Sequence, residues 1–343
     1  MADSNNMSDL WKRLRFVLIG IIVYRIGTHI PIPGIDPQRL SSLFDQNQGT
    51  ILELFNLFSG GALERMSIFA LNVVPYISAA IIMQLFSNSI PYLIELKKDG
   101  QAGRNAITQY TRYGTVLLAF IQASALAVTL SSGGLAYNPG TAFFVSAVFS
   151  VVAGTIFLMW LGEQISERGI GNGISIIIAT SILTGIPSAI GQALEQARQG
   201  DLNILMLLSI GVLAMVVIAV VVFIERGQRR ITVNYAQRQQ GRKLMQAQAS
   251  HLPFKVNMAG VIPAIFASTF LLFPASLSTW FGQGENFGFL QSISLALNPG
   301  QPLYVLTFAA LIISFCFIWL ALTFNTREVS DNLKRSGAYI PGI

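Results

Sequence analysis

The sequence predicts an all-α protein that crosses a membrane several times. Of its 343 residues, 52% are hydrophobic and 11% are charged, whereas soluble globular domains carry about 25% charged residues. The apolar residues also gather in runs that approach the roughly 20 residues a helix needs to cross the hydrocarbon core. These observations exclude an ordinary cytosolic enzyme, a disordered chain and a coiled coil.

Eight apolar runs define the expected spans. The sixth run, ILMLLSIGVLAMVVIAVVVFI, has no charged residue and is the clearest. The second and fifth include Ser, Asn, Gln or Gly, which favours helices that line a wet interior over helices that face only lipid. We expect spans at roughly 16–33, 69–90, 114–131, 142–162, 173–191, 203–224, 259–280 and 303–323.

The basic residues predict the orientation of these spans. With the N-terminus inside and the spans alternating, 18 of the 22 Lys and Arg residues fall in inside stretches, whereas only Arg39, Arg65 and Arg198 fall outside. This bias predicts that both ends lie in the cytoplasm. The basic start of the first span would also suit a signal peptide, but no small-x-small cleavage site follows, so we interpret it as a retained helix.

The stretch between the first two spans is irregular. It contains PIPG at 31–34 and FSGGALERMSIFAL at 58–71. Gly60 and Gly61 end any helix before them, and we expect a short helical piece after them, followed by an apolar run that Pro75 kinks. This pattern fits backbone that folds back into a protein-lined cavity, and equally an external loop with a small surface helix.

The longest inside loop, residues 225–255, is strongly basic. It holds seven basic residues and one acidic residue, Glu225. Positive loops stay inside, which explains the charge, but few residues are needed to join two helices. The stretch RRITVNYAQRQ alternates well enough for a short hairpin, and a protruding basic hairpin suits docking to RNA or to an acidic protein surface.

Catalytic and metal-binding motifs are absent from the sequence, which contains no HExxH, GxSxG or GxxxxGK[ST]. The single cysteine, Cys316, excludes an intrachain disulfide and a cysteine metal cluster, and His29 and His251 cannot form a metal site alone. GIGNG at 169–173 is similar to a phosphate loop but follows no strand, so we interpret it as a flexible turn with Asn172 as a helix N-cap. We expect no cofactor and no enzymatic activity.

Charged residues inside the spans also bear on function. All 16 acidic residues fall in loops or at span ends, which weakens the hypotheses of a coupled transporter and of a proton pump. Arg25 is the one ionisable residue inside a span. It lies toward the outer end, where its side chain can snorkel, so the sequence allows a structural role and a pore-facing role equally.

Eight runs, spread over nearly the whole chain and in the right order, resemble the SecY family of protein translocase subunits. They are RIGTHIPIPGID, FSGGALERMSIFAL, PYISAAIIMQL, TRYGTVLLA, MWLGEQISERGIGNGISIII, ERGQRRITVNYAQRQQGRK, HLPFKVNMAGVIPAIFAS and NPGQPLYV. The resemblance implies a translocon channel of ten transmembrane helices in two halves, related by an inverted pseudo-two-fold axis. Residues 1–200 would hold the first five helices and residues 201–343 the next three, so that eight of ten are present and the chain is truncated before the last two.

The resemblance also implies a function and partners. The chain would be the central pore-forming subunit of the Sec channel, which translocates unfolded secretory proteins and releases membrane proteins laterally into the bacterial inner membrane. A partner would supply the energy. The implied partners are the SecE and SecG subunits, the SecA motor ATPase, the ribosome, signal sequences and nascent polypeptides, membrane lipids, and the accessory proteins SecDF and YidC.

A pore ring of aliphatic side chains is implied at the waist of this channel. The matching residues are Val73, Ile77, Ile174, Ile178 and Ile265, and a sixth would lie on the last helix. The i, i+4 spacing of the first two pairs places each pair on one helix face, and an apolar constriction gates by dewetting. Without the resemblance, simple helix packing is the favoured interpretation of these residues.

Three further sites are implied by the same resemblance. A plug segment, residues 60–72, would sit beneath the pore ring when the channel is idle, with Gly60 and Gly61 as its hinge and Ile68 and Phe69 as apolar contacts. A lateral gate toward lipid would include Ser78, Gln122, Asn257 and Phe273. The basic loop would bind SecA or the ribosome through Arg226, Arg229, Arg230, Arg238, Arg242, Lys243 and Lys255.

Two other classes of protein remain as alternatives. A secondary transporter with inverted repeats and broken helices would place a polar site and usually a carboxylate at the midplane, where this chain offers aliphatic residues. An intramembrane enzyme would need a nucleophile with its base, or a metal motif.

Overall fold

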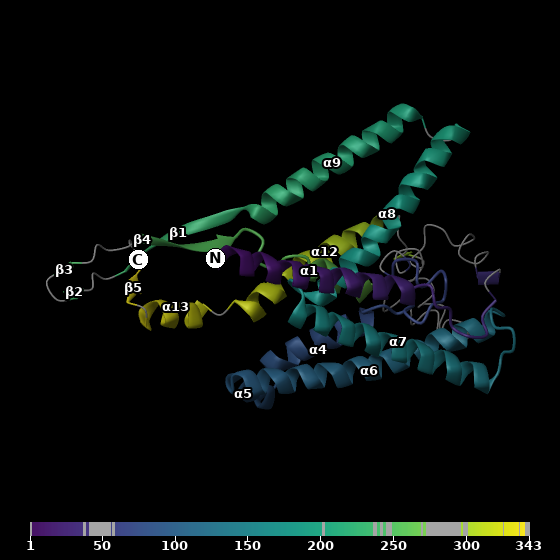
Figure 1. Ribbon diagram of the computed structural model, residues 1–343, viewed down its shortest axis with the longest axis horizontal. Coiled ribbons are helices and arrows are strands. Elements are labelled where there is room, and N and C mark those ends of the chain that lie inside the picture. Colours follow the sequence, from purple (N-terminus) through teal and green to yellow (C-terminus); the bar gives the residue numbers. More distant parts are fainter. Residues whose placement is uncertain are drawn as a thin grey trace. The chain divides into compact units, whose positions relative to one another are not determined.

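The computed structural model of the protein is mostly helical over the residues it describes (Figure 1). Two compact units are present: Met1–Gln192 with Ser268–Phe308, and Ala193–Ala267 with Ala309–Ile343. The described residues are 2–36, 39–40, 56, 59–200, 203–235, 239–240, 243–244, 249–268, 270–271, 296–297, 301–324, 326–335 and 337–339.

The first unit is built from long helices. Two of these helices have a proline at their start. Pro75 lies in the first turn of the helix Val74–Ser89, and Pro91 is the first residue of the helix Pro91–Lys98, after the extended residue Ile90. Proline suits these positions because its φ is fixed and it has no backbone N–H. The expected kink at Pro75 is therefore wrong, and the chain bends instead by 93° at Ile90. The helices are α1 (Ala2–Gly27), α4 (Val74–Ser89), α5 (Pro91–Lys98), α6 (Gln101–Ser132), α7 (Thr141–Arg168) and α8 (Gly173–Gln199), which belongs to this unit up to Gln192.

Helix α7 lies at the centre of this unit and packs against α1, α4 and α6. Half of the most apolar stretch of α7 is buried. Its neighbour α6 presents Ala119, Ala123 and Ala127 on one buried face, and such small side chains let membrane helices approach closely. A 2.8 Å ion pair between Arg112 and Glu163 also joins α6 to α7.

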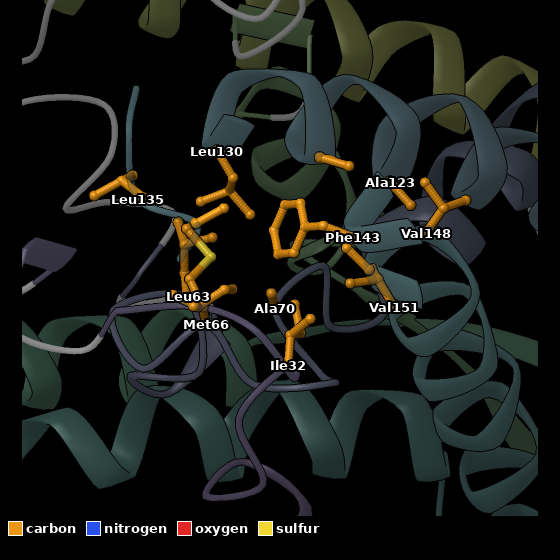
Figure 2. Packing of buried hydrophobic residues seen from close by; sticks show 14 of the residues in the cluster. Ile32, Leu63, Met66, Ala70, Ala123, Leu130, Leu135, Phe143, Val148 and Val151 are labelled. Carbon is orange, nitrogen blue, oxygen red and sulfur yellow. The ribbon is translucent and has the colours of Figure 1, made fainter. Parts of the chain in front are cut away.

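A hydrophobic core joins these helices to the irregular stretch before α4. Figure 2 shows Phe143 and Val151 of α7 and Leu130 of α6 directed toward Met66 and Ala70. This stretch supplies side chains to the core and is therefore part of the packed unit. Such packing is required if the stretch folds back into a protein-lined cavity, and it is not expected of a loop on the surface.

The second unit combines helices with a small sheet. Helix α9 (Ile204–Arg226) leads into β1 (Gln228–Tyr235), which pairs antiparallel with β4 (Ala249–Lys255) and with β5 (Ala338–Tyr339), in the order β4-β1-β5. β2 (Gln239–Gln240) pairs with β3 (Lys243–Leu244). The helices α12 (Pro302–Thr323), which belongs to this unit from Ala309 on, and α13 (Thr326–Arg335) follow. The expected hairpin within RRITVNYAQRQ is thus wrong in extent, because RRITVNY forms one strand and pairs with residues 249–255.

The described residues include five helices long and apolar enough to cross a membrane, α6, α7, α8, α9 and α12, and a sixth if the bent pair α4 and α5 is one span. Helix α1 lies outside this set because its basic residues share the helix with a short apolar run. The expected seventh span is helical at 262–268 and 270–271, and residues 272–280 lie outside the described part. The total of eight spans stays a prediction.

Candidate functional site

Four of the five expected pore-ring residues meet in one apolar cluster. Val73 is 1% exposed and belongs to the buried part of the cluster, and Ile77, Ile174 and Ile178 pack against it half-buried. Val73 immediately precedes α4, and its carbonyl accepts a 3.0 Å hydrogen bond from the backbone N–H of Ile77. The pairs from α4 and α8 are therefore directed into the same apolar region of the first unit.

The start of α8 is fixed by the turn before it. Asn172 accepts a 3.2 Å hydrogen bond from the backbone N–H of Ser175 through its side chain, and the Ser166 hydroxyl accepts one of 2.8 Å from Gly173. A Cβ at Gly173 would overlap the carbonyl of Gly162 on α7, so α8 can begin this close to α7 only with glycine there. The interpretation of GIGNG as a turn with an N-cap at Asn172 is confirmed, and this turn positions Ile174 and Ile178.

The fifth pore-ring residue, Ile265, lies in the second unit. It is half-buried in the helical stretch 262–268, and its backbone N–H donates a 3.3 Å hydrogen bond to the carbonyl of Val261. Phe266 next to it makes edge contacts with Phe315 and Trp319 of α12, at 5.9 and 5.5 Å between ring centroids. The membership of Ile265 in the ring stays a prediction.

The plug segment is a series of turns and contains no helix after Gly61, so the expected short helical piece is wrong. Met66 and Asn72 adopt positive φ values of 42° and 48°, which a right-handed helix cannot contain. Four-residue turns replace the helix; for example, the backbone N–H of Ala70 donates to the carbonyl of Ser67 at 2.9 Å.

Backbone hydrogen bonds tie this segment to the chain that follows α1. The backbone N–H of Ile32 donates to the Met66 carbonyl at 2.8 Å, and that of Ile68 donates to the Ile30 carbonyl at 3.0 Å. These bonds flank a short antiparallel bridge between Pro31 and Ser67. The PIPG motif therefore holds the middle of the plug segment in place.

Two glycines make room for the far end of the plug segment. The Phe69 ring stacks between Tyr24 of α1 and Phe157 of α7, with centroids 6.1 and 5.9 Å away. A Cβ at Gly27 would overlap this ring, and a Cβ at Gly154 would overlap the Ile68 carbonyl. Ile68 and Phe69 belong to the same cluster as Val73 and the isoleucines of α4 and α8.

The glycines at the near end adopt left-handed backbone conformations. Gly60 and Gly61 have φ values of 66° and 79°, a region that favours glycine. A Cβ at Gly60 would also stand 3.0 Å from the Thr184 hydroxyl and 3.1 Å from the Ser181 backbone of α8. Both positions favour glycine, and their role as a hinge stays a prediction.

The lateral-gate residues fall in different surroundings. Ser78 on α4 and Gln122 on α6 are half-buried on two helices that pack together. Asn257 donates a 2.9 Å hydrogen bond from Nδ2 to Oε1 of Glu225, and its Oδ1 accepts one of 3.1 Å from the backbone N–H of Gly260. Phe273 lies outside the described residues.

The docking residues lie at the base of the hairpin formed by β1 and β4. Arg229 and Arg230 on β1, and Lys255 on β4, are exposed, as is Arg226 at the end of α9. Gln228 pairs with Lys255 in the register of the two strands. Arg238 and Arg242 lie outside the described residues, and Lys243 is described only as part of β3.

Sequence reasoning missed three contributors to this site, Tyr24, Gly27 and Gly154, and left the role of Arg25 open between a structural and a pore-facing one. Tyr24 and Arg25 contact carbonyls 35 residues away, and Gly27 and Gly154 accommodate the plug segment. Gly27 lies in the RIGTH motif, inside the first expected span at 16–33. A glycine within an apolar span is therefore the sequence signal that could have found this residue. In the part of the chain that the structure describes, no group of three His, Cys, Asp or Glu residues could hold a metal ion.

Comparisons with known proteins agree with this arrangement. A model of the SecY family matches residues 67–343. The protein translocase subunit SecY of Pseudomonas aeruginosa is 62% identical over 341 residues, covering 99% of this chain and 77% of that protein. Two solved structures, each 18% identical, cover 97% of this chain and 78% of theirs, with TM-scores of 0.69 and 0.67. The first is described as the structure of a protein conducting channel, and the second concerns a plug domain of SecY that stabilises the closed channel and maintains a membrane seal; at this identity they show the fold.

Proposed function

Because the chain belongs to the SecY family, we propose that it forms the pore through which unfolded secretory proteins cross the bacterial inner membrane. The protein spans that membrane several times. The observation that carries the proposal is the meeting of Val73, Ile77, Ile174 and Ile178 with the plug segment in one apolar cluster. Membrane proteins would leave the same pore sideways into lipid.

An aliphatic waist suits both tasks of such a pore. Ions lose hydration in a narrow apolar constriction, and water itself leaves it, so the idle channel conducts little. A passing extended chain finds no hydrogen-bonding partner in Val and Ile side chains that would hold it back. The plug segment, packed against the same residues, adds a second barrier that must move before a chain enters.

Charge placed in the waist tests this proposal. In membrane vesicles that contain the complete complex, Ile77→Glu and Ile178→Glu should raise the ion leak of the idle channel, because a carboxylate holds water in the constriction. Ile178→Val keeps the apolar surface and is the matched control. If both Glu variants show the ion leak of the wild type and translocate a precursor at the wild-type rate, the proposal is contradicted.

The finer assignments follow from the same proposal. The lateral gate would comprise Ser78, Gln122, Asn257 and Phe273, and the hairpin of β1 and β4 would dock SecA or the ribosome, either of which would supply energy to a chain that is not itself an enzyme. SecE and SecG would complete the channel. The exposed guanidinium groups of Arg229 and Arg230 support the docking role, because exposed cations steer acidic partners and RNA.

A further inference from the structure

Two neighbouring residues of α1 bind two neighbouring carbonyls at the hinge of the plug segment. The hydroxyl of Tyr24 donates a 3.1 Å hydrogen bond to the carbonyl oxygen of Ser59. Nη1 of Arg25 donates one of 3.2 Å to the carbonyl oxygen of Gly60. Tyr24 is 1% exposed and Arg25 is half-buried, so both bonds lie where water competes weakly for the carbonyls.

Tyr24 contacts both the residue that precedes the plug segment and Phe69 near the end of the segment. Its hydroxyl binds the residue before the hinge, and its ring is parallel to that of Phe69 within 2°. Gly27, one turn further along α1, leaves the space that the Phe69 ring occupies. One face of α1 therefore holds the start and the far end of the segment together.

The side-chain donors supplement an irregular backbone at the hinge, where the Ser59 carbonyl also accepts a long backbone hydrogen bond, of 3.4 Å, from the N–H of Ala62. Gly60 has a φ of 66°, so the chain here is neither helix nor strand. A carbonyl left without a donor in a buried site costs free energy. Arg25 supplies a charged donor, which binds more strongly than a neutral one, and this contact also gives the intramembrane cation a partner.

We propose that Tyr24 and Arg25 form a latch that holds the hinge of the plug segment and sets how readily the closed channel opens. The inference rests on the proposed channel function. Displacing the segment must break both hydrogen bonds and separate the Phe69 ring from the Tyr24 ring. Tyr24 and Arg25 are thus positioning residues that act through the plug segment. Weakening the latch should lower the signal strength that a precursor needs to open the channel.

The test compares export of two precursors by the full-length protein in its native membrane complex, one with an intact signal sequence and one with a weakened, less hydrophobic signal. Tyr24→Phe removes one hydroxyl and keeps the ring on Phe69, and Arg25→Gln removes the charged donor. Tyr113→Phe, at an exposed position on α6, is the matched control. We expect the ratio of weak-signal to intact-signal export to rise about two- to tenfold in Tyr24→Phe, the factor that one net hydrogen bond is worth, and at least as much in Arg25→Gln, with no change in Tyr113→Phe.

A purely structural role for these residues predicts a different result, in which export of both precursors falls together and their ratio is unchanged. That result, or an unchanged ratio at normal export, would overturn the latch while leaving the channel function intact. If Arg25→Gln does not accumulate in the membrane, Tyr24→Phe alone decides between the two outcomes. If the wild-type protein exports neither precursor, the proposed channel function fails and the latch fails with it.

Discussion

At the scale of single residues, glycines decide how closely the plug segment packs. Gly27 and Gly154 lie within helices where nothing in the backbone conformation requires glycine, yet a Cβ at either position would overlap the segment. Their value is the space they leave for Phe69 and for the Ile68 carbonyl. A methyl group added there must displace a packed neighbour, which usually costs about 1–3 kcal/mol.

Gly27→Ala should therefore loosen the plug segment and lower the thermal midpoint of the purified protein. The loss of packing should exceed the gain of up to about 1 kcal/mol in helix propensity from replacing glycine by alanine. Gly211→Ala on α9, where a Cβ meets no atom within 4 Å, should leave the midpoint unchanged or raise it. Thermal unfolding of the two variants in detergent measures this, and equal midpoints would show that Gly27 has no packing role.

At the scale of elements, the hairpin is joined to the membrane helices at its base. Asn257 links the stretch after β4 to Glu225 at the end of α9, and the backbone N–H of Val256 donates to the Gly227 carbonyl at 3.0 Å. Asn257 also accepts a hydrogen bond from the backbone N–H of Gly260, just before the helical stretch 262–268 that carries Ile265. The proposed gate role of Asn257 and this structural role make different predictions.

Asn257→Leu should change how hydrophobic a signal sequence must be for export, because it removes hydrogen bonds worth about 0.5–2 kcal/mol. Glu225→Ala removes the partner at the hairpin base and leaves Asn257 in place. A changed threshold in Asn257→Leu alone supports the gate role, whereas equal changes in both variants assign the effect to the hairpin base. An unchanged threshold in Asn257→Leu, measured by export of a graded series of signals, contradicts the gate role.

The charge on the hairpin gives a second prediction at this scale. Reversing Arg229 and Arg230 to Glu should weaken binding of ribosomes and SecA, and the defect should shrink as salt increases, because salt screens the exposed charges in the wild type as well. Reversal of Lys12 and Arg13 on α1 changes the net charge equally and is the control. Co-sedimentation over a salt series measures both, and unaltered binding in the hairpin variant would remove the docking role.

At the scale of the whole molecule, the helices differ in how exposed their apolar side chains are, and α9 and α12 are the most exposed of the helices long enough to span a membrane. Within the described chain, no part of the most apolar stretch of α9 or of α12 is buried, whereas half of the corresponding stretch of α7 is buried. Continuous exposed apolar surface of this kind requires lipid or protein cover. The positive-inside bias then predicts which ends of the helices face the cytoplasm.

Accessibility of single cysteines tests this orientation. With Cys316 replaced by Ser, Tyr137→Cys should react with a membrane-impermeant thiol reagent from outside intact cells, since Tyr137 is 64% exposed between α6 and α7. His251→Cys on β4 should react only after the membrane is opened. The reverse pattern would invert the predicted topology and place the basic hairpin outside.

Much of the fold follows from the sequence because apolar runs and helix caps are local signals. The apolar runs predicted α6, α7, α8, α9 and α12, and Asn172 predicted the start of α8. The conformation of the plug segment could not be predicted in this way, since the positive φ values of Met66 and Asn72 arise in a segment packed on distant helices. The hydrogen bond between Tyr24 and Ser59 could not be predicted either, because it joins residues 35 positions apart in the sequence.

The most direct measurement is crosslinking of a stalled secretory precursor to photoreactive side chains placed in the apolar cluster. Probes at Ile77 and Ile178 should crosslink to the precursor, and a probe at Phe149, which is 66% exposed on α7, should crosslink to lipid instead. This result is expected if the extended polypeptide passes between α4 and α8. Crosslinks from Phe149 with none from Ile77 or Ile178 would contradict a path through these residues.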